Sequence, residues 1–200
     1  MTKQVLILGG SGRIGSRVAA DLLTHTSAQV TIAGRNPEIG ARINRALVKE
    51  GGATIAKRCQ FLSLNLENQV CLQKAIADAN LVIHCAGPFH KRNASVLKLC
   101  IELGVNYVDV SDHPSFTCKA IALRAKAEAA GITAIVNTGI FPGISNSMVR
   151  RDIEQLDQAN AVHLSYVVGG SGGAGVTVMR STFLGLQRSF EAWVNGERQT

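Results

Sequence analysis

The first 137 residues alternate between short apolar runs and longer amphipathic stretches. The apolar runs are nearly continuous, which is typical of parallel strands that are buried on both faces of a sheet. The stretches between them show helical spacing, as in Ile14, Val18 and Leu22. This alternation predicts an α/β fold, a Rossmann-type doubly wound parallel sheet with right-handed crossovers. The predicted strands span residues 5–8, 29–33, 58–64, 81–85, 106–110 and 132–136, and the predicted helices span 37–50, 67–78, 94–103 and 115–130, after a first helix that begins near Ile14.

The pattern changes near Asn137, where a loop rich in Gly and Pro begins. We expect residues 1–137 to form the first domain and residues 138–200 to begin a second, α+β domain. Asn195-Gly196 is a strong hairpin signal, yet little chain follows it. We therefore expect this second domain to be incomplete. Its predicted elements are a helix over 146–155, a strand over 161–168, a glycine loop over 169–175, a helix over 177–187 and a strand over 190–194.

Composition and charge narrow the class of protein. Of the 200 residues, 46% are apolar, which suits a globular core. No apolar run is long enough to span a bilayer, so no transmembrane helix is expected. The opening Met-Thr-Lys-Gln leads directly into a strand and does not resemble a signal peptide. The formal net charge is +7, but the basic residues are scattered, which favours a phosphorylated small molecule over nucleic acid as the partner.

The cysteine pattern points to a reducing compartment. There are five cysteines, an odd number, and none form a C-x-x-C pair. Such residues are typical of small core side chains. We expect no disulfide framework, no zinc or other metal site, and a cytoplasmic location.

A glycine-rich turn, Gly9-Gly10-Ser11-Gly12-Arg13-Ile14-Gly15, separates the first strand from the first helix. This strand–turn–helix order is that of a dinucleotide-binding unit, in which Gly10 makes the tight turn, Gly12 leaves room for a pyrophosphate and Gly15 lets the helix pack closely on the strand. The helix N-terminus offers N–H groups and a positive dipole end to the anion. The alternative is a turn without a ligand. The predicted cofactor contacts here are Gly10, Ser11, Gly12, Arg13 and Ile14.

The end of the second strand indicates which dinucleotide binds. Arg35 follows Gly15 by twenty residues, where an NAD-binding unit usually has an Asp or Glu for the ribose 2′-hydroxyl. A guanidinium there matches a 2′-phosphate in charge and geometry. The sequence therefore predicts NADP rather than NAD, with contacts from Arg35 and Asn36 and a second cation in Arg13. A solvated surface arginine is the alternative.

Further candidates follow the other strands, because ligands of open α/β sheets bind at the carboxyl ends of the strands. The acid/base candidates are Asp109, which ends a buried strand, and His113, whose alternative role is to cap the next helix. We interpret His84, inside an apolar strand, as a core histidine. The chain has no Tyr-x-x-x-Lys, Gly-x-Ser-x-Gly, Walker or His-Glu-x-x-His motif. Predicted cofactor contacts at these strand ends are Asn65, Ala86, Gly87, Pro88 and Ser111.

Several motifs together resemble the saccharopine dehydrogenase-like oxidoreductases. They are the glycine turn, Ala-Gly-Arg at 33–35, Cys-Ala-Gly-Pro-Phe at 85–89, Tyr-Val-Asp-Val-Ser at 107–111 and Gly-Ile-Phe-Pro-Gly-Ile-Ser-Asn at 139–146. The resemblance implies a Rossmann domain that binds NAD(P), followed by an α+β domain for substrate contacts and often a dimer interface. The chain departs from the family at His84, where Asn is common, and at Asp112-His113, where Gly-Glu is common.

The family's reactions leave the substrate open. They include dehydrogenation of C–N bonds and reduction of C=C bonds in lipid synthesis. Our leading hypothesis is an NADP-dependent oxidoreductase that acts on a small-molecule imine or amine and forms a homodimer. The alternatives are an enoyl reductase and a non-catalytic NADP-binding sensor or scaffold. A nucleic-acid binder is suggested only by the basic pI, and we expect the 200 residues alone to bind NADP without turnover.

Overall fold

A computed structural model describes residues 2–167, 183, 186–187, 189 and 192–199. By its internal contacts the chain divides into two compact units, Met1–Val162 and His163–Thr200. The first unit holds the sheet and all the candidate site residues. This division by contacts does not test the predicted boundary near Asn137 between two domains that fold independently, so that boundary stays a prediction.

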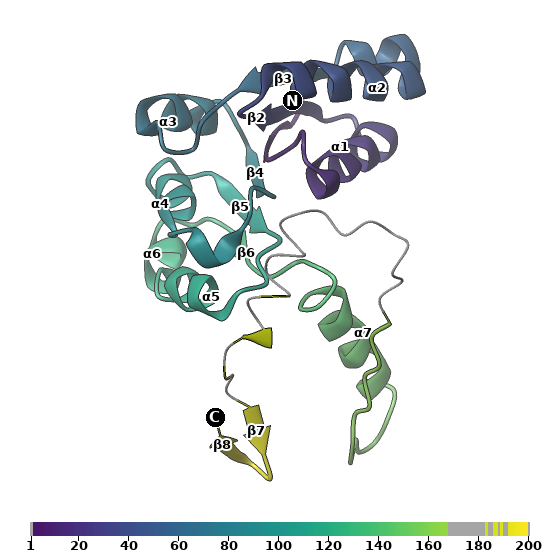
Figure 1. Cartoon of the computed structure of the whole chain (residues 1–200), viewed down its shortest axis with the longest axis vertical. Coiled ribbons are helices and arrows are strands. Elements are labelled where there is room, and N and C mark those ends of the chain that lie inside the picture. Colours follow the sequence, from purple (N-terminus) through teal and green to yellow (C-terminus); the bar gives the residue numbers. More distant parts are fainter. Residues whose placement is uncertain (1, 168–182, 184–185, 188, 190–191, 200) are drawn as a thin grey trace. The chain divides into compact units, whose positions relative to one another are not determined.

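The first unit is built on a six-stranded sheet (Figure 1). The strand order is β3-β2-β1-β4-β5-β6, and every pair is parallel, which confirms the predicted Rossmann-type sheet. The order reverses between β1 and β4, so the crevice for a ligand is expected at the carboxyl ends of these two strands. The strands are β1 Gln4–Leu8, β2 Gln29–Gly34, β3 Cys59–Ser63, β4 Leu81–His84, β5 Asn106–Asp109 and β6 Ala134–Ile135.

Helices cover both faces of the sheet because the strands are apolar on both sides. Leu6 and Leu8 of β1 pack in one cluster with residues of α3, α4 and α5, whereas Val5 and Ile7 pack in a second cluster with residues of α1 and α2. Figure 1 shows these two groups of helices on opposite sides of the sheet. The helices of this unit are α1 Arg13–His25, α2 Pro37–Ala56, α3 Gln69–Ala77, the 3₁₀ helix η1 Phe89–Lys91, α4 Ser95–Glu102, α5 Pro114–Ile121, α6 Arg124–Ala129 and α7 Ile144–Ile153.

Helix α1 is rotated by one residue from its predicted orientation. The buried positions are Gly15, Ala19 and Leu23, and not Ile14, which is 51% exposed. Gly15 explains the difference, because a Cβ there would overlap the backbone of Gly9. The helix therefore makes its closest approach to the sheet at Gly15, and this leaves Ile14 facing outward beside the glycine turn.

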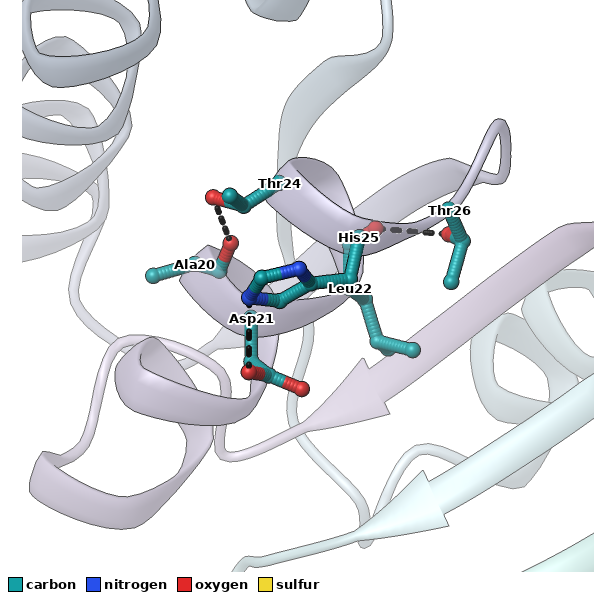
Figure 2. A network of polar contacts seen from close by, with 6 residues as sticks. All are labelled: Ala20, Asp21, Leu22, Thr24, His25 and Thr26. Atoms are coloured by element: carbon teal, nitrogen blue, oxygen red, sulfur yellow. Dashed lines mark hydrogen bonds and ion pairs between the residues drawn. The ribbon is translucent and has the colours of Figure 1, made fainter.

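The C-terminal end of α1 is held by polar contacts (Figure 2). The Thr26 hydroxyl donates to the Leu22 carbonyl at 2.6 Å, and His25 lies 3.6 Å from Asp21. Arg58, just before β3, donates to three carbonyls at this end of the helix and in the loop that follows. A cation at a helix C-terminus interacts favourably with the negative end of the helix dipole. The helix that begins at the glycine turn is thus anchored at its other end.

One predicted helix boundary is confirmed and another is wrong. The first helical stretch of α2 ends at the predicted stop, because Gly52 has a non-helical backbone with φ 69° and ψ −165°, and a further helical stretch follows to Ala56. The long helix predicted over 115–130 is two helices, α5 and α6, separated by a turn at 122–123.

One strand predicted for the region after Asn137 is not observed. Residues 161–167 have no strand conformation, although a strand was expected over 161–168. In the second unit, β7 Ala192–Val194 and β8 Glu197–Gln199 pair in antiparallel fashion across Asn195-Gly196. The hairpin is confirmed, and it has a short return strand where almost none was expected. The glycine loop over 169–175 and most of the helix over 177–187 lie outside the described residues.

Candidate cofactor site

The glycine turn after β1 is tightly built. Gly9 carries the positive φ of 77°, and Gly10 donates to the Ile7 and Ala33 carbonyls at 3.1 and 3.0 Å. A Cβ on Gly10 would lie 2.7 Å from the Cβ of Ile32. The sharp turn therefore falls on Gly9, one residue before its predicted place, while Gly10 is required for close packing against β2.

Gly12 has a different reason to be glycine. Its backbone is extended, with φ −82° and ψ 173°, a conformation that any residue adopts. It is exposed, and an added Cβ would meet only the Gly9 carbonyl oxygen, at 3.1 Å. The fold thus demands glycine less strictly here than at Gly15, and the open space lies at the start of α1.

The N-terminus of α1 is open to an anion. No side chain caps it, and its first turn contains no acidic residue. The first N–H groups of a helix need partners and carry its positive dipole end. Arg13 and Ile14, both exposed, flank this end. An exposed glycine beside an uncapped helix start fits the pyrophosphate of a dinucleotide.

Arg35 lies next to this turn. Gly9 and Gly10 both donate to the Ala33 carbonyl, and a Cβ on Gly34 would overlap the Ser11 hydroxyl. The exposed Arg35 follows directly, so the structure brings Ser11 and Arg35 together as predicted contacts of one ligand. Asn36 is the N-cap of α2, and its Oδ1 accepts from the Ile39 N–H at 3.0 Å. No carboxylate is in the sequence directly after β2 where an NAD ribose would need one.

The loop after β4 closes the other side of the glycine turn. A Cβ on Gly9 would lie 2.9 Å from the Cα of Ala86, so the two backbones are in contact. Ala86, Gly87 and Pro88 are each half-buried. Arg92, a residue that the sequence interpretation missed, donates from Nε to the Ala86 carbonyl at 3.1 Å. The exposed Asn65, after β3, accepts from the Glu67 N–H at 3.1 Å.

Asp109 and Ser111 form a buried network instead of an exposed pair. Both are fully buried, and Asp109 Oδ1 accepts from Ser111 N, Ser111 Oγ and Asn137 N at 2.9, 2.6 and 3.0 Å. Asn137 has φ 61°, which Asn tolerates better than most residues, and its side-chain amide donates to the Ser111 carbonyl at 2.9 Å. Neither Asp109 nor Ser111 reaches the surface, so direct contact with a ligand would require this network to open.

The Asp109 carboxylate lies near the Tyr107 phenol. Burial and then this carboxylate raise the pKa of Tyr107. Asp109 Oδ2 has no hydrogen-bond partner of normal geometry among the described residues. The carboxyl group thus lies in the core at the end of β5, where Oδ1 accepts its three hydrogen bonds.

His113 caps α5. Its Nδ1 accepts from the Ser115 N–H at 3.3 Å and lies 2.8 Å from the Ser115 hydroxyl oxygen. The ring is half-buried, and the His90 ring lies 5.8 Å from it between centroids. The cap confirms the structural alternative for His113, and a catalytic role stays a prediction.

A large open cavity adjoins the ends of β5 and β6. Its volume is about 1040 Å³, and its lining is mostly apolar with a few polar groups. Its lining includes Thr138, Pro142 and Gly143 of the Gly/Pro loop that follows β6. The lining residues that bear polar or charged groups are Asp112, Thr117, Asn137, Thr138, Asn146, Ser147 and Arg151.

Comparison with known proteins decides the family. Residues 5–135 match the model of the saccharopine dehydrogenase NADP binding domain. The chain belongs to this family. A saccharopine dehydrogenase-like oxidoreductase of Rattus norvegicus is 26% identical over 145 residues, which are 68% of this chain and 34% of the relative. A putative trans-acting enoyl reductase of Mycobacterium tuberculosis is 24% identical over 180 residues, which are 84% of this chain and 42% of the relative.

The structure of saccharopine dehydrogenase (L-Glu forming) from Saccharomyces cerevisiae is also similar. The TM-score is 0.59 at 27% identity, over 76% of this chain and 31% of the yeast chain. The chain thus spans about a third of the length of the rat and yeast proteins. Family and fold agree with the resemblance that the motifs indicated.

The described residues of this saccharopine dehydrogenase NADP-binding domain contain no group of three or more His, Cys, Asp and Glu side chains that could hold a metal ion. None of the helices in the described ranges is long and apolar enough to cross a bilayer. Burial raises the pKa of the Cys59 thiol to about 11 and those of Cys85 and Cys100 to about 12, so these thiols stay protonated at neutral pH.

His84 is a core residue in this family member, as interpreted. It is fully buried at the end of β4 and lies edge-on to the rings of Phe89 and Phe116. Its Nδ1 accepts from the Ala86 N–H at 3.3 Å, while Nε2 has no partner among the described residues. Burial, helped by the positive charge of Arg92, lowers the pKa of His84 to about 3. The imidazole is therefore neutral and supports the loop that contacts Gly9.

His84 is expected to make the domain acid-sensitive. The unfolded chain takes up a proton on this ring near pH 6.5, whereas the folded protein does so only near pH 3. Stability from this residue is complete above pH 6.5 and falls by about 1.4 kcal/mol per pH unit as the pH drops through that window. Urea unfolding of the wild type and His84→Asn at several pH values should show a shallower pH dependence in the variant. The exposed His25→Asn is the control, and equal slopes for wild type and His84→Asn would contradict this assignment.

Proposed function

We propose that this chain is the cofactor-binding part of an NADP-dependent oxidoreductase acting on a C–N bond of a small imine or amine. The observation that carries the proposal is the uncapped N-terminus of α1 at Gly12, beside Arg35 and with no acid directly after β2. NADPH, when bound, supplies the hydride. The chain's own residues bind the cofactor, orient it and hold a proton near the substrate.

The anionic groups of the cofactor have separate partners in this proposal. The first N–H groups of α1 would bind the pyrophosphate, and Arg35 would bind the 2′-phosphate. The loop of Ala86–Pro88 forms the neighbouring wall, held against Gly9 by backbone packing. These elements come from the three central strands β2, β1 and β4, whose relative positions the sheet fixes.

His113 is the better candidate for proton transfer of the two acid/base residues. Its Nδ1 accepts from the Ser115 N–H, so Nε2 is the ring nitrogen that would exchange a proton with a substrate. Asp109 is buried, and its Oδ1 accepts three hydrogen bonds. This suits a role in positioning Asn137 and the loop that follows. We therefore assign proton transfer to His113 and positioning to Asp109.

The names of the relatives support two reaction classes. The yeast saccharopine dehydrogenase favours C–N chemistry, whereas the mycobacterial relative is a putative enoyl reductase and its similarity extends over 84% of this chain. Reduction of C=C bonds is therefore the second candidate. Both reactions use the same cofactor end of the site and differ in the substrate.

The reaction class can be tested by following cofactor absorbance. The natural full-length protein would be mixed with NADPH and either a keto acid plus an amine or an enoyl thioester. Consumption only with the first mixture supports the proposal, and consumption only with the enoyl thioester supports the alternative. Tight NADPH binding with no consumption in either mixture would favour a non-catalytic sensor or scaffold.

Arg35→Ala is expected to weaken NADPH binding by roughly ten- to a hundred-fold, because one charge-assisted contact to the 2′-phosphate contributes about 1.5–3 kcal/mol. NADH, which lacks this phosphate, should bind with unchanged affinity. Isothermal titration calorimetry with both cofactors measures the difference. Equal loss of affinity for NADPH and NADH would mean that Arg35 does not bind the 2′-phosphate.

A further inference from the structure

Gly34, the residue before Arg35, leaves room for a side chain of the glycine turn. It is the last residue of β2, and a Cβ there would overlap the hydroxyl group of Ser11. Gly34 is not among the glycines with a positive φ, so its backbone does not itself require glycine. The space that a side chain at Gly34 would fill is therefore the space in which the Ser11 hydroxyl lies.

The glycine turn runs along β2 toward this point. The Gly10 N–H donates to the Ala33 carbonyl at 3.0 Å, which fixes the turn against the strand. Ser11, the next residue of the turn, lies against Gly34, the next residue of the strand. These contacts place the Ser11 hydroxyl at the carboxyl end of β2, directly before Arg35.

The polar groups at this point are available to a ligand. Ser11 is half-buried, and its hydroxyl forms no hydrogen bond with the described part of the chain. Arg35 is exposed, and the ion pairs within 4.0 Å found among the described residues include neither it nor Glu38 in the first turn of α2. A hydroxyl donor beside a guanidinium without an ion pair favours an anion with several acceptor oxygens.

We propose that the Ser11 hydroxyl, in the space left by Gly34, donates a hydrogen bond to the adenosine 2′-phosphate of NADP and, with Arg35, determines the preference for NADP over NAD. This inference rests on the proposed function. In a dinucleotide-binding unit the end of the second strand faces the adenosine ribose, whereas the pyrophosphate lies at the start of the first helix. The place of the hydroxyl, over the last residue of β2, favours the 2′-phosphate.

The first test compares cofactor affinities by isothermal titration calorimetry. Ser11→Ala removes the hydroxyl group and keeps the Cβ. We expect it to weaken NADPH binding by about tenfold and to leave NADH within about twofold of the wild type. Adenosine 2′-monophosphate should lose affinity in parallel with NADPH, whereas adenosine 5′-monophosphate should not. Ser27→Ala, which removes an exposed serine before the other end of β2, is the matched control and should change none of these affinities.

Gly34→Ala tests the same contact without removing a polar group. The new methyl group takes the place of the Ser11 hydroxyl, which must turn away, while Arg35 remains. The other nearest atoms, Ser11 Cβ and Phe61 Cε2, lie 3.4 and 3.7 Å from the added Cβ, so the fold can accept alanine. We expect Gly34→Ala to lose NADPH affinity as selectively as Ser11→Ala does. In the double variant the second substitution should add little, because both act on one hydroxyl group.

The outcomes separate this inference from the function on which it rests. Equal weakening of NADPH and NADH in Ser11→Ala would mean that the hydroxyl contacts the pyrophosphate or shapes the turn, and would overturn the inference. Unchanged NADPH affinity in Ser11→Ala or in Gly34→Ala would overturn it as well, and the proposed function would stand if Arg35→Ala still lost the preference. A wild-type chain that binds neither cofactor would overturn both.

Discussion

Gly12→Val is expected to abolish NADPH binding, by about a hundredfold or more, while the protein stays folded. The new side chain would fill the space above the first turn of α1, where the pyrophosphate is expected. The backbone of Gly12 is extended, and an added Cβ would meet only the Gly9 carbonyl oxygen at 3.1 Å. The backbone must move by a few tenths of an ångström to accept this contact, so we expect the protein to stay folded with reduced stability. Calorimetry and urea unfolding measure the two effects separately.

Two further variants provide the contrast for this result. Gly12→Ala adds a single methyl group and should lose less affinity than valine does. Gly15→Val should unfold the protein, because a Cβ there would overlap the Gly9 carbonyl oxygen. A folded Gly12→Val protein that binds NADPH like the wild type would show that the cofactor does not lie above this turn.

The sheet was predictable because its strands are marked by local pattern. Residues such as those of β4, Leu81–His84, form a nearly continuous apolar run, and a helix-length segment separates each run from the next. Parallel order and a reversal at β1 follow from these signals and from the handedness of crossovers. The glycine turn was predictable for the same reason, since strand, turn and helix adjoin in sequence.

Contacts across long sequence separations were not predictable in this way. Arg58 reaches the end of α1 from 32 residues away, and Asn137 reaches Asp109 from 28 residues away. Arg92 likewise lies at the cofactor edge only because η1 turns the chain back over Ala86. The sequence marks these residues only as an ordinary arginine or asparagine in a loop, so their roles depend on where the chain folds.

The end of β5 shows the limit of reasoning from strand ends. Asp109 and Ser111 follow the rule that ligands bind where parallel strands end, and both were predicted as site residues. Whether such a side chain faces the crevice or the core depends on the next turn of the chain. Here Asn137, with φ 61°, brings its N–H to the Asp109 carboxylate and closes the network from the side of β6.

Asp109→Ala is expected to lower the free energy of unfolding by about 3–5 kcal/mol. The substitution leaves the Ser111 N–H, the Ser111 hydroxyl and the Asn137 N–H without their shared acceptor in a fully buried place. Each hydrogen bond to a charged group contributes about 1.5–3 kcal/mol, and loss of one partner leaves buried groups unsatisfied. Urea unfolding near neutral pH measures the loss.

Asp109→Asn is the matched variant that separates shape from charge. Its Oδ1 can accept the same three hydrogen bonds, and its new N–H₂ group takes the place of Oδ2, which has no partner of normal geometry among the described residues. We expect Asn to retain most of the stability that Ala loses, and NADPH affinity to follow the stability of each variant. If Asp109→Asn keeps the fold and NADPH binding but eliminates turnover in the natural full-length protein, the carboxylate takes part in the reaction and its positioning role is insufficient. A stable Asp109→Ala protein would contradict the structural role directly.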